Sequence, residues 1–260
     1  MLNRQCFMTQ QFSLKFFNLY LISFKRFTIG LLVMCLFTGN LGAETTLQSN
    51  QEVVILIHGL GRTYRSMKKL QKNLVQEGYI VRNIKYPSKK HSIKTLVDSY
   101  IAPIVNDYRN QAKIHFVGHS LGGILTRVYL NNYSISNLGR VVMMGTPNKG
   151  SSIVNKLRDY SVCRWYLGPA FLELSTDLNS VPNSLTIPDY PLGLIAGTKS
   201  VNPFLSQFVK GENDGKVSVE SVRLGNYPLK KIHVSHTWIM THNDVIENVI
   251  NFLKYETFLD

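Results

Sequence analysis

A serine stands between two glycines in the run Gly118-His119-Ser120-Leu121-Gly122, which has the spacing Gly-x-Ser-x-Gly. The run joins the apolar stretch 114–117, typical of a strand, to the stretch 121–129, typical of a helix. In that setting the glycines permit a strained turn that holds the serine hydroxyl clear of the sheet. The pattern therefore predicts that Ser120 is a nucleophile that attacks a carbonyl of the ester type. The alternative is a glycine-rich turn that only lets a helix pack closely on a sheet.

A base must accept the proton of the serine hydroxyl, and histidine is the usual base. His236 has the best position, because it follows the apolar stretch 231–235 and precedes the last predicted helix by a short loop. His242 is the alternative, although its place suits a residue directly before that helix. The remaining histidines lie in a strand, at a strand end, in the serine turn or in a polar loop: His58, His91, His115, His119 and His233.

The base needs a carboxylate that orients its ring and stabilises the imidazolium. Asp214 is the best candidate, because it lies between the fifth and sixth predicted strands in Glu212-Asn213-Asp214-Gly215. Asp177 and Asp189 come earlier and suit turns or helix caps. The alternative for Asp214 is that Asn-Asp-Gly is only a turn.

Negative charge on the substrate oxygen must be met by donors already in place, usually backbone amides. Leu121 directly follows the nucleophile and supplies one amide. The loop His58-Gly59-Leu60-Gly61 supplies the other, and we expect it to be that of Leu60 because glycines let the backbone approach the substrate.

Short apolar stretches alternate with helical patterns along the chain, which predicts a doubly wound, mostly parallel sheet of about six strands. The predicted strands are 53–57, 79–86, 113–117, 140–144, 192–196 and 231–235. The predicted helices include 67–74, 93–104, 121–129 and 244–255. Ligands of such sheets bind beyond the carboxyl ends of the strands, where His58, Ser120, Gly145 and His236 stand.

Residues 148–190 do not fit this alternation. The stretch has no clear strand and carries large apolar side chains among Pro and Gly: Trp165, Tyr166, Phe171, Leu172 and Leu174. We interpret it as an insertion folded over the edge of the sheet that holds Ser120.

Residues 1–43 contain four basic residues and no acidic one. The apolar run 27–37 is too short to span a bilayer, and small residues follow it up to Ala43. This order predicts a secretory signal peptide and an exported α/β domain over 44–260. An uncleaved membrane anchor or a buried helix is the alternative. Only Cys163 of the three cysteines lies after the leader, so the exported chain has no internal disulfide.

The chain is basic, with a formal net charge of +13. No zinc-ligand spacing, nucleic-acid motif or basic run interleaved with aromatics accompanies this charge, so a nucleic-acid partner is not expected. An anionic membrane surface suits an exported basic protein better. A solvated basic surface without a partner explains the charge equally well. The sequence does not indicate the oligomeric state.

Four motifs in this order resemble those of bacterial lipases and esterases of the α/β-hydrolase superfamily. They are His58-Gly59-Leu60-Gly61, Gly118-His119-Ser120-Leu121-Gly122-Gly123, Gly145-Thr146-Pro147-Asn148-Lys149-Gly150-Ser151 and Asn213-Asp214-Gly215-Lys216-Val217. The resemblance spans about residues 52–255. It implies an α/β-hydrolase fold, the triad Ser120, Asp214 and His236, a short cap or lid over 148–190, and no cofactor. Thr237 follows His236 and the nearest later acid is Asp244, so no metal is assigned.

The function expected from these residues is hydrolysis of hydrophobic acyl esters, with a lipid or another small ester as substrate. A thioesterase or an acyltransferase would use the same triad, because only the leaving group or the acceptor differs. A membrane-associated binding protein that kept the fold without catalysis is the alternative from another class.

Overall fold

Five consecutive apolar residues form the first strand of the structure. The computed structural model describes residues 51–201 and 206–260, so the predicted leader 1–43 lies outside the described residues. In β1 (Val53–Ile57) every side chain is fully buried. A strand without alternation is covered on both faces, which requires helices on both sides of its sheet.

The strands form one six-stranded sheet in which every neighbouring pair is parallel, with the order β2-β1-β3-β4-β5-β6. The other strands are β2 (Ile80–Asn83), β3 (Ile114–His119), β4 (Leu138–Met144), β5 (Leu192–Gly197) and β6 (Leu229–Ile232). This arrangement confirms the predicted doubly wound sheet.

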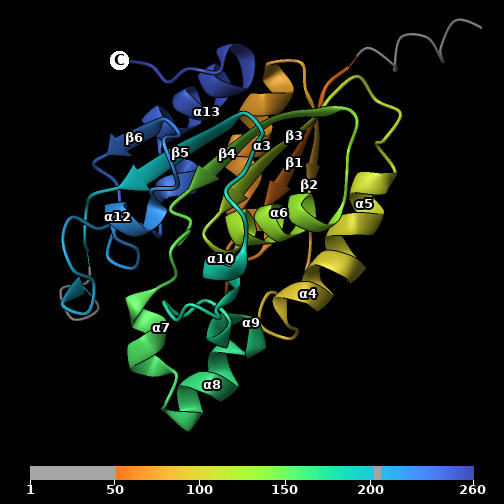
Figure 1. The fold of residues 1–260 in the computed structure, drawn as a ribbon. Coiled ribbons are helices and arrows are strands. Elements are labelled where there is room, and N and C mark those ends of the chain that lie inside the picture. Colours follow the sequence, from red (N-terminus) through yellow and green to blue (C-terminus); the bar gives the residue numbers. More distant parts are fainter. Residues whose placement is uncertain (1–50, 202–205) are drawn as a thin grey trace, which may run out of the picture. The chain divides into compact units, whose positions relative to one another are not determined.

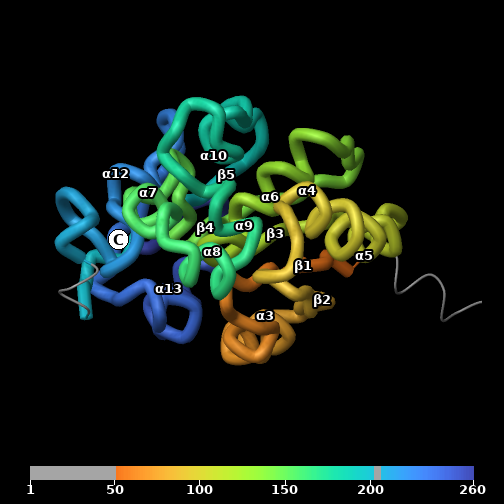
Figure 2. Tube along the Cα trace, turned by 90° about the horizontal axis from the view of Figure 1, so that it is seen from below, coloured from red at the N-terminus to blue at the C-terminus, as the bar shows by residue number. Residues whose placement is uncertain are grey.

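Helices cover both faces of the sheet (Figures 1 and 2). Val54 and Leu56 of β1 join the apolar cluster under α3 and α13, whereas Val53, Ile55 and Ile57 join the cluster under α6 and its neighbours. The bounds of these helices are η1 (Tyr64–Met67), α3 (Lys68–Gln76), α4 (Ile93–Leu96), η2 (Val97–Ile101), α5 (Ala102–Asn106), α6 (Leu121–Asn132), α12 (Val219–Val222), η3 (Ile239–Thr241) and α13 (Asn243–Tyr255).

Two strands are shorter or placed earlier than predicted. β2 is an edge strand that pairs only from Ile80 to Asn83, because its partner β1 ends at Ile57. β6 pairs with β5 up to Ile232, where β5 ends. His236 therefore follows its strand after a short loop instead of directly.

The segment 148–190 between β4 and β5 forms short helices and no strand. Its helices are α7 (Ser152–Leu157), α8 (Ser161–Leu167), α9 (Pro169–Leu172) and α10 (Val181–Ser184). Figure 1 shows them together beyond one edge of the sheet. Within 51–201 and 206–260, no helix is long and apolar enough to cross a membrane.

A buried arginine on α6 ties this segment to the sheet. Arg127 is only 3% exposed and has no carboxylate partner in the described part of the chain. Its guanidinium instead donates to backbone or amide oxygens of the segment, namely those of Asn148, Pro182, Leu185 and Thr186. Burial lowers the pKa of Arg127, yet the group stays charged because its usual value is so high. Several carbonyl oxygens of 148–190 thus accept hydrogen bonds from this one side chain.

The substitution Arg127→Ala tests this anchor. It leaves several buried carbonyls without a donor, so we expect the free energy of unfolding to fall by about 2–4 kcal/mol. Urea denaturation measures the change. Arg82→Ala, at an exposed position on β2, is the matched control and is expected to change stability by less than about 0.5 kcal/mol. Equal effects of the two substitutions would contradict the anchoring role.

Candidate active site

Ser120 occupies a strained turn at the carboxyl end of β3. Its φ is +54°, a left-handed conformation that non-glycine residues rarely adopt, and α6 begins at the next residue. The turn needs Gly122, because a Cβ there would lie 2.1 Å from the carbonyl oxygen of Ile57. The backbone amide of Ser120 donates to the carbonyl of Met144 at 2.9 Å. Neighbouring strands on both sides therefore fix this serine.

The structure brings Ser120, His236 and Asp214 together. His236 Nε2 lies 3.1 Å from Ser120 Oγ, and His236 Nδ1 lies 2.7 Å from Asp214 Oδ2. Both His236 and Asp214 are buried. If Nδ1 carries the proton and donates to Asp214, Nε2 is free to accept the serine proton. The arrangement has the geometry of a nucleophile, a base and an orienting acid.

Asp214 is held by the backbone around it. Its Oδ1 accepts from the amides of Lys216 at 3.0 Å and Val217 at 2.8 Å, which leaves Oδ2 for the histidine. The amide of His236 also donates to the carbonyl of Asp214 at 3.0 Å. Gly145 at the end of β4 makes room for this pair, because a Cβ there would lie 3.1 Å from Asp214 Oδ2.

The alternative residues are engaged elsewhere. His242 lies directly before α13, and its Nδ1 is 3.9 Å from a carboxylate oxygen of Asp244. Asp177 forms an ion pair with Arg158 and accepts from the hydroxyl of Ser175. The distances thus favour His236 and Asp214 as partners of the serine.

The loop after β1 forms a tight turn beside Ser120. The amide of Arg62 donates to the carbonyl of Gly59 at 3.1 Å, and Gly61 has a φ of +67°, so Leu60 stands at the second position of a turn. The amide of Gly61 donates to Ser88 Oγ at 3.0 Å, which anchors the loop. Leu121, the first residue of α6, has an amide without an acceptor inside the helix. Leu60 and Leu121 thus flank the serine from two elements.

His58, at the start of this loop, holds it in place through contacts with Tyr86. Its buried ring stacks on Tyr86 with the ring centroids 4.1 Å apart, and the Tyr86 hydroxyl donates to its carbonyl oxygen. Burial lowers the pKa of His58, although hydrogen bonds with the backbone raise it in part. A neutral His58 is therefore a structural support of the loop.

His119, which was not among the predicted site residues, contacts His236. Its Nε2 donates to the carbonyl oxygen of His236 at 3.2 Å, and the two rings lie 4.9 Å apart. Burial lowers the pKa of His119 well below its usual range, and electrostatic repulsion from neighbouring groups, Arg62 and Lys216 among them, lowers it further. His119 is thus neutral at physiological pH and positions His236. Its place inside the serine turn was the only signal in the sequence.

A hollow of about 290 Å³ opens at Ser120 and His236. Seven of its fifteen lining residues come from segment 148–190, namely Ser151, Ile153, Val154, Leu157, Leu167, Phe171 and Leu174. Arg62 and Lys216 add positive charge beside the apolar wall. Trp165 and Tyr166 do not line this hollow and are exposed. The predicted insertion therefore contributes to the site through α7 and α9 more than through its largest aromatic residues.

Solved structures of low sequence identity share this fold. The mature lipase BlEst2 of Bacillus licheniformis superposes with a TM-score of 0.61 and 20% identity, over 81% of this chain and 93% of the lipase. A lipase-esterase related protein from Clostridium acetobutylicum gives a TM-score of 0.50 and 17% identity, over 79% and 96% of the two chains. Tomato methylketone synthase I superposes with a TM-score of 0.52 and 11% identity, over 80% of this chain and 99% of the synthase. These similarities confirm the α/β-hydrolase fold.

One family model matches the sequence, that of palmitoyl protein thioesterase, over residues 53–188. The matched part contains the loop of Leu60, the turn of Ser120 and nearly all of segment 148–190, and it ends before Asp214 and His236. A comparison with curated protein sequences gave no match. Since the matched residues make up more than half of the chain, it belongs to the palmitoyl protein thioesterase family, a thioesterase- and lipase-like family of α/β-hydrolases.

Proposed function

We propose that this protein is a serine hydrolase that cleaves hydrophobic acyl esters through an acyl-enzyme intermediate. The observation that carries the proposal is the continuous hydrogen-bonded chain from Ser120 Oγ through His236 to Asp214 at the mouth of an apolar hollow. A chain of this kind activates an otherwise weak hydroxyl nucleophile.

In this mechanism the Ser120 oxygen attacks the ester carbonyl carbon while His236 Nε2 accepts the hydroxyl proton. The amides of Leu60 and Leu121 donate to the oxyanion that forms. His236 then gives the proton to the departing alcohol oxygen, the bond to that oxygen breaks, and the acyl group stays on Ser120. Water attacks the acyl-enzyme with His236 as base, which releases the acid and restores the serine hydroxyl. Asp214 stabilises the imidazolium in both halves.

The apolar wall of the hollow supports an acyl chain as the part of the substrate that it binds. Val154, Leu157, Phe171 and Leu174 all line it. Burial of a methylene group contributes about 0.8 kcal/mol, so such a wall favours chains of several carbons over acetyl groups.

Thioester cleavage is the second candidate. It is favoured by the family match, because the matched family takes its name from a thioesterase. The chemistry of the triad is the same, and only the leaving atom changes from oxygen to sulfur. Acyl transfer is a further alternative, in which an alcohol in place of water attacks the same acyl-enzyme. Product rates measured with and without added alcohol distinguish transfer from hydrolysis.

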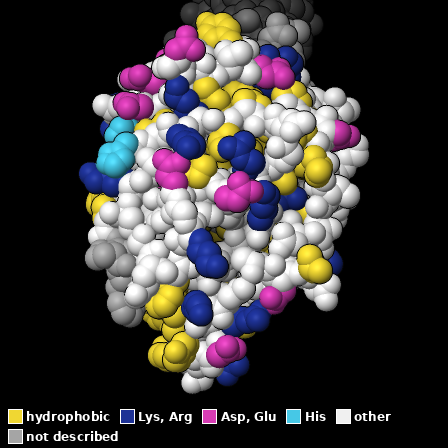
Figure 3. All heavy atoms as spheres, turned by 60° about the vertical axis from the view of Figure 1, so that its left-hand side comes forward, with side chains coloured by type: hydrophobic (Ala, Val, Ile, Leu, Met, Phe, Trp, Pro, Cys, Tyr) yellow, Lys and Arg dark blue, Asp and Glu magenta, His cyan; other side chains and the backbone are white. Residues whose placement is uncertain are grey.

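The same proposal includes export and contact with an anionic membrane surface. Export rests on the sequence of the predicted leader 1–43. The proposed contact with a membrane surface is supported by α8, where Val162, Trp165 and Tyr166 are exposed. Lys89 Nζ lies 3.7 Å from the Tyr166 ring centroid. Figure 3 shows hydrophobic side chains beside Lys and Arg at the end of the molecule where Figure 1 places α7 and α8. Apolar groups with neighbouring cations suit an anionic lipid interface.

Ser120→Ala tests the nucleophile. We expect hydrolysis of a chromogenic acyl ester to fall by about 10⁴-fold or more, and a fluorophosphonate probe to label the parent protein and not the variant. Ser134→Ala, at an exposed serine, is the matched control and keeps both signals. A parent protein that the probe does not label would favour a binding protein without catalysis.

Replacing each candidate base by alanine separates His236 from His242. His236→Ala removes the group that accepts the serine proton, so kcat is expected to fall by about 10³-fold or more. His242→Ala should keep kcat within about threefold, since its contact is with Asp244. Steady-state kinetics on a soluble ester measure both. The reverse order of effects would overturn the assignment.

Trp165→Ser tests the surface around α8. The loss of an exposed aromatic side chain, 83% accessible here, removes apolar area that would enter the lipid interface. We expect binding to phosphatidylcholine vesicles that contain phosphatidylglycerol to weaken by about tenfold in co-sedimentation. Tyr255→Ser, at an exposed aromatic residue on α13, is the control and is expected to bind as the parent does. Equal binding of Trp165→Ser and the parent would remove α8 from the proposal.

A further inference from the structure

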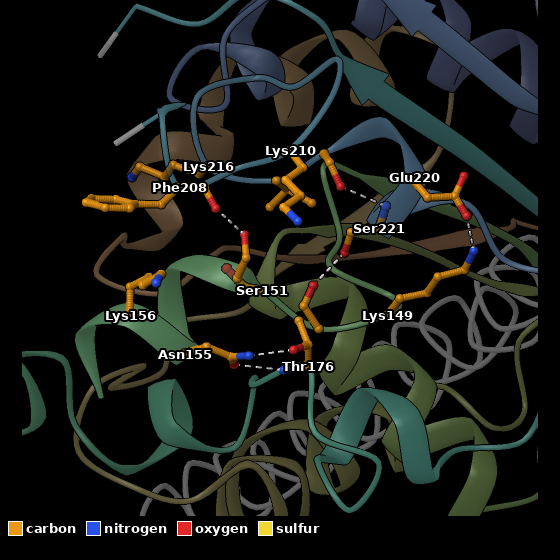
Figure 4. Close-up of a pocket in the computed structure, with 14 residues that line it drawn as sticks. Lys149, Ser151, Asn155, Lys156, Thr176, Phe208, Lys210, Lys216, Glu220 and Ser221 are labelled. Carbon is orange, nitrogen blue, oxygen red and sulfur yellow. Dashed lines mark hydrogen bonds and ion pairs between the residues drawn. The ribbon is translucent and has the colours of Figure 1, made fainter. Parts of the chain in front are cut away.

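A second hollow, of about 510 Å³, lies next to the one that opens at Ser120. It is bounded by α7, by the turn that contains Thr176, by α12 and by the loop 206–218 (Figure 4). Four lysines line it, two from segment 148–190 and two from the loop 206–218: Lys149, Lys156, Lys210 and Lys216. Among the described residues, the only acidic side chain in its wall is Glu220.

Most of this positive charge is not neutralised by the protein. Lys149 forms an ion pair with Glu220, which also lies 3.7 Å from Arg223. Lys156, Lys210 and Lys216 have no ion pair in the part of the chain that the structure describes. Three like charges around one hollow repel one another, and an anion bound between them relieves that repulsion.

The hollow also offers neutral hydrogen-bond donors. Thr176 Oγ1 accepts from the Asn155 side-chain amide at 2.5 Å, so its own proton can be donated elsewhere. The Ser151 hydroxyl has no hydrogen bond within residues 51–201 and 206–260. Ammonium groups and hydroxyl donors together match a ligand with several acceptor oxygens.

The two hollows are adjacent and share part of their walls. Ser151, Lys216 and Val217 line both of them. The backbone amides of Lys216 and Val217 also hold the Asp214 carboxylate, so the wall between the hollows is the loop that carries the acid. The side chain of Lys216 is exposed in part, but burial of its ammonium lowers its pKa. The neighbouring charge of Arg62 lowers this pKa further, whereas Asp214 raises it. A ligand that occupies both hollows reaches from Ser120 to the lysines.

We propose that the lysine-lined hollow binds a phosphate group on the leaving-group side of the substrate, so that the preferred substrate is a phosphate-bearing acyl ester or thioester. This inference rests on the proposed hydrolase function of Ser120. The apolar hollow takes the acyl chain, the scissile carbonyl lies at Ser120, and the phosphate on the departing alcohol or thiol lies among Lys156, Lys210 and Lys216.

Phosphate fits this hollow better than a carboxylate does. A lysine ammonium is a compact point charge that binds phosphate without the planar, two-pronged geometry that arginine offers to carboxylates. A phosphate monoester carries a charge of about −2 and three unesterified oxygens, and the three ammonium groups and two hydroxyls can neutralise that charge and donate to each of these oxygens. Two kinds of leaving group carry a phosphate, namely glycerol phosphate, a few bonds from the ester oxygen, and a phosphorylated pantetheine thiol, at the opposite end of the chain from the sulfur.

The test compares kcat/KM for four substrates that share one short acyl chain: an acylglycerol, the corresponding acylglycerol phosphate, an acyl-pantetheine thioester and the corresponding acyl-phosphopantetheine thioester. We expect the parent protein to prefer at least one phosphorylated substrate over its unphosphorylated counterpart, which is the acylglycerol or the acyl-pantetheine. The variant Lys156→Glu/Lys210→Glu should lower that preference by about tenfold or more, because two attractions become repulsions. Added salt should weaken the preference of the parent protein.

The variant Lys68→Glu/Lys72→Glu on α3 is the matched control. It changes the net charge by the same amount at two exposed lysines that do not line the hollow, and it should keep the parent's preference. The milder Lys156→Gln/Lys210→Gln variant serves if the reversed charges impair folding. Loss of the preference in both hollow variants and not in the control supports the inference, and the substrate that shows it identifies the leaving group.

Two other results overturn the inference in distinguishable ways. A parent protein that hydrolyses the acylglycerol and is labelled at Ser120, but prefers neither phosphorylated substrate or keeps its preference in the hollow variants, overturns the inference and leaves the proposed function intact. A parent protein that hydrolyses none of the substrates and is not labelled overturns both.

Discussion

The close approach of Gly122 to the carbonyl oxygen of Ile57 is the constraint on which the site depends. A Cβ at Gly122 would lie 2.1 Å from that oxygen, so α6 can begin against the end of β1 only because this residue has no side chain. The contact joins the turn of Ser120, which follows β3, to the loop of Leu60, which follows β1. These two strands pair with each other from Val53 to Ile57 of β1. The amides proposed to receive the oxyanion are therefore placed by the sheet and not by flexible side chains, which is the preorganisation that such a site needs.

The other half of the site is held by short-range backbone contacts. Asp214 accepts two amides from its own loop and its carbonyl accepts a third from His236, so the acid and the base are oriented together. His119 links this pair back to the serine turn through the His236 carbonyl. Since Lys216 is part of the same loop, a negative charge bound near it acts only two residues from the acid. An anion bound as we propose would therefore lie beside the loop that orients His236.

Local patterns predicted most of the fold and the three central residues. The strand, turn and helix around Ser120 are contiguous in sequence, and His236 and Asp214 follow from their order along the strands. The ends of β2 and β6 were missed, because a strand ends where its neighbour stops pairing, and that information lies far away in the chain. The roles of His119 and Arg127 were missed for the same reason: their partners lie 117 and 21 to 59 residues away. The lysine hollow unites segments that no local pattern connects.

Under the proposed function, the walls of the site select the acyl compound more than the three residues Ser120, His236 and Asp214 do. The same fold occurs in tomato methylketone synthase I at 11% identity, so the sheet alone does not select a substrate. The family match covers Ser120 and nearly all of segment 148–190, but it ends before the loop 206–218. That loop supplies the acid and two of the four lysines. The acyl side of the site is therefore built from sequence shared with the family, whereas the leaving-group side is built from sequence outside the match. Under the proposed phosphate site, a difference in substrate between this chain and other family members is expected on the side of the lysines, where charge contributes more to binding than apolar fit does.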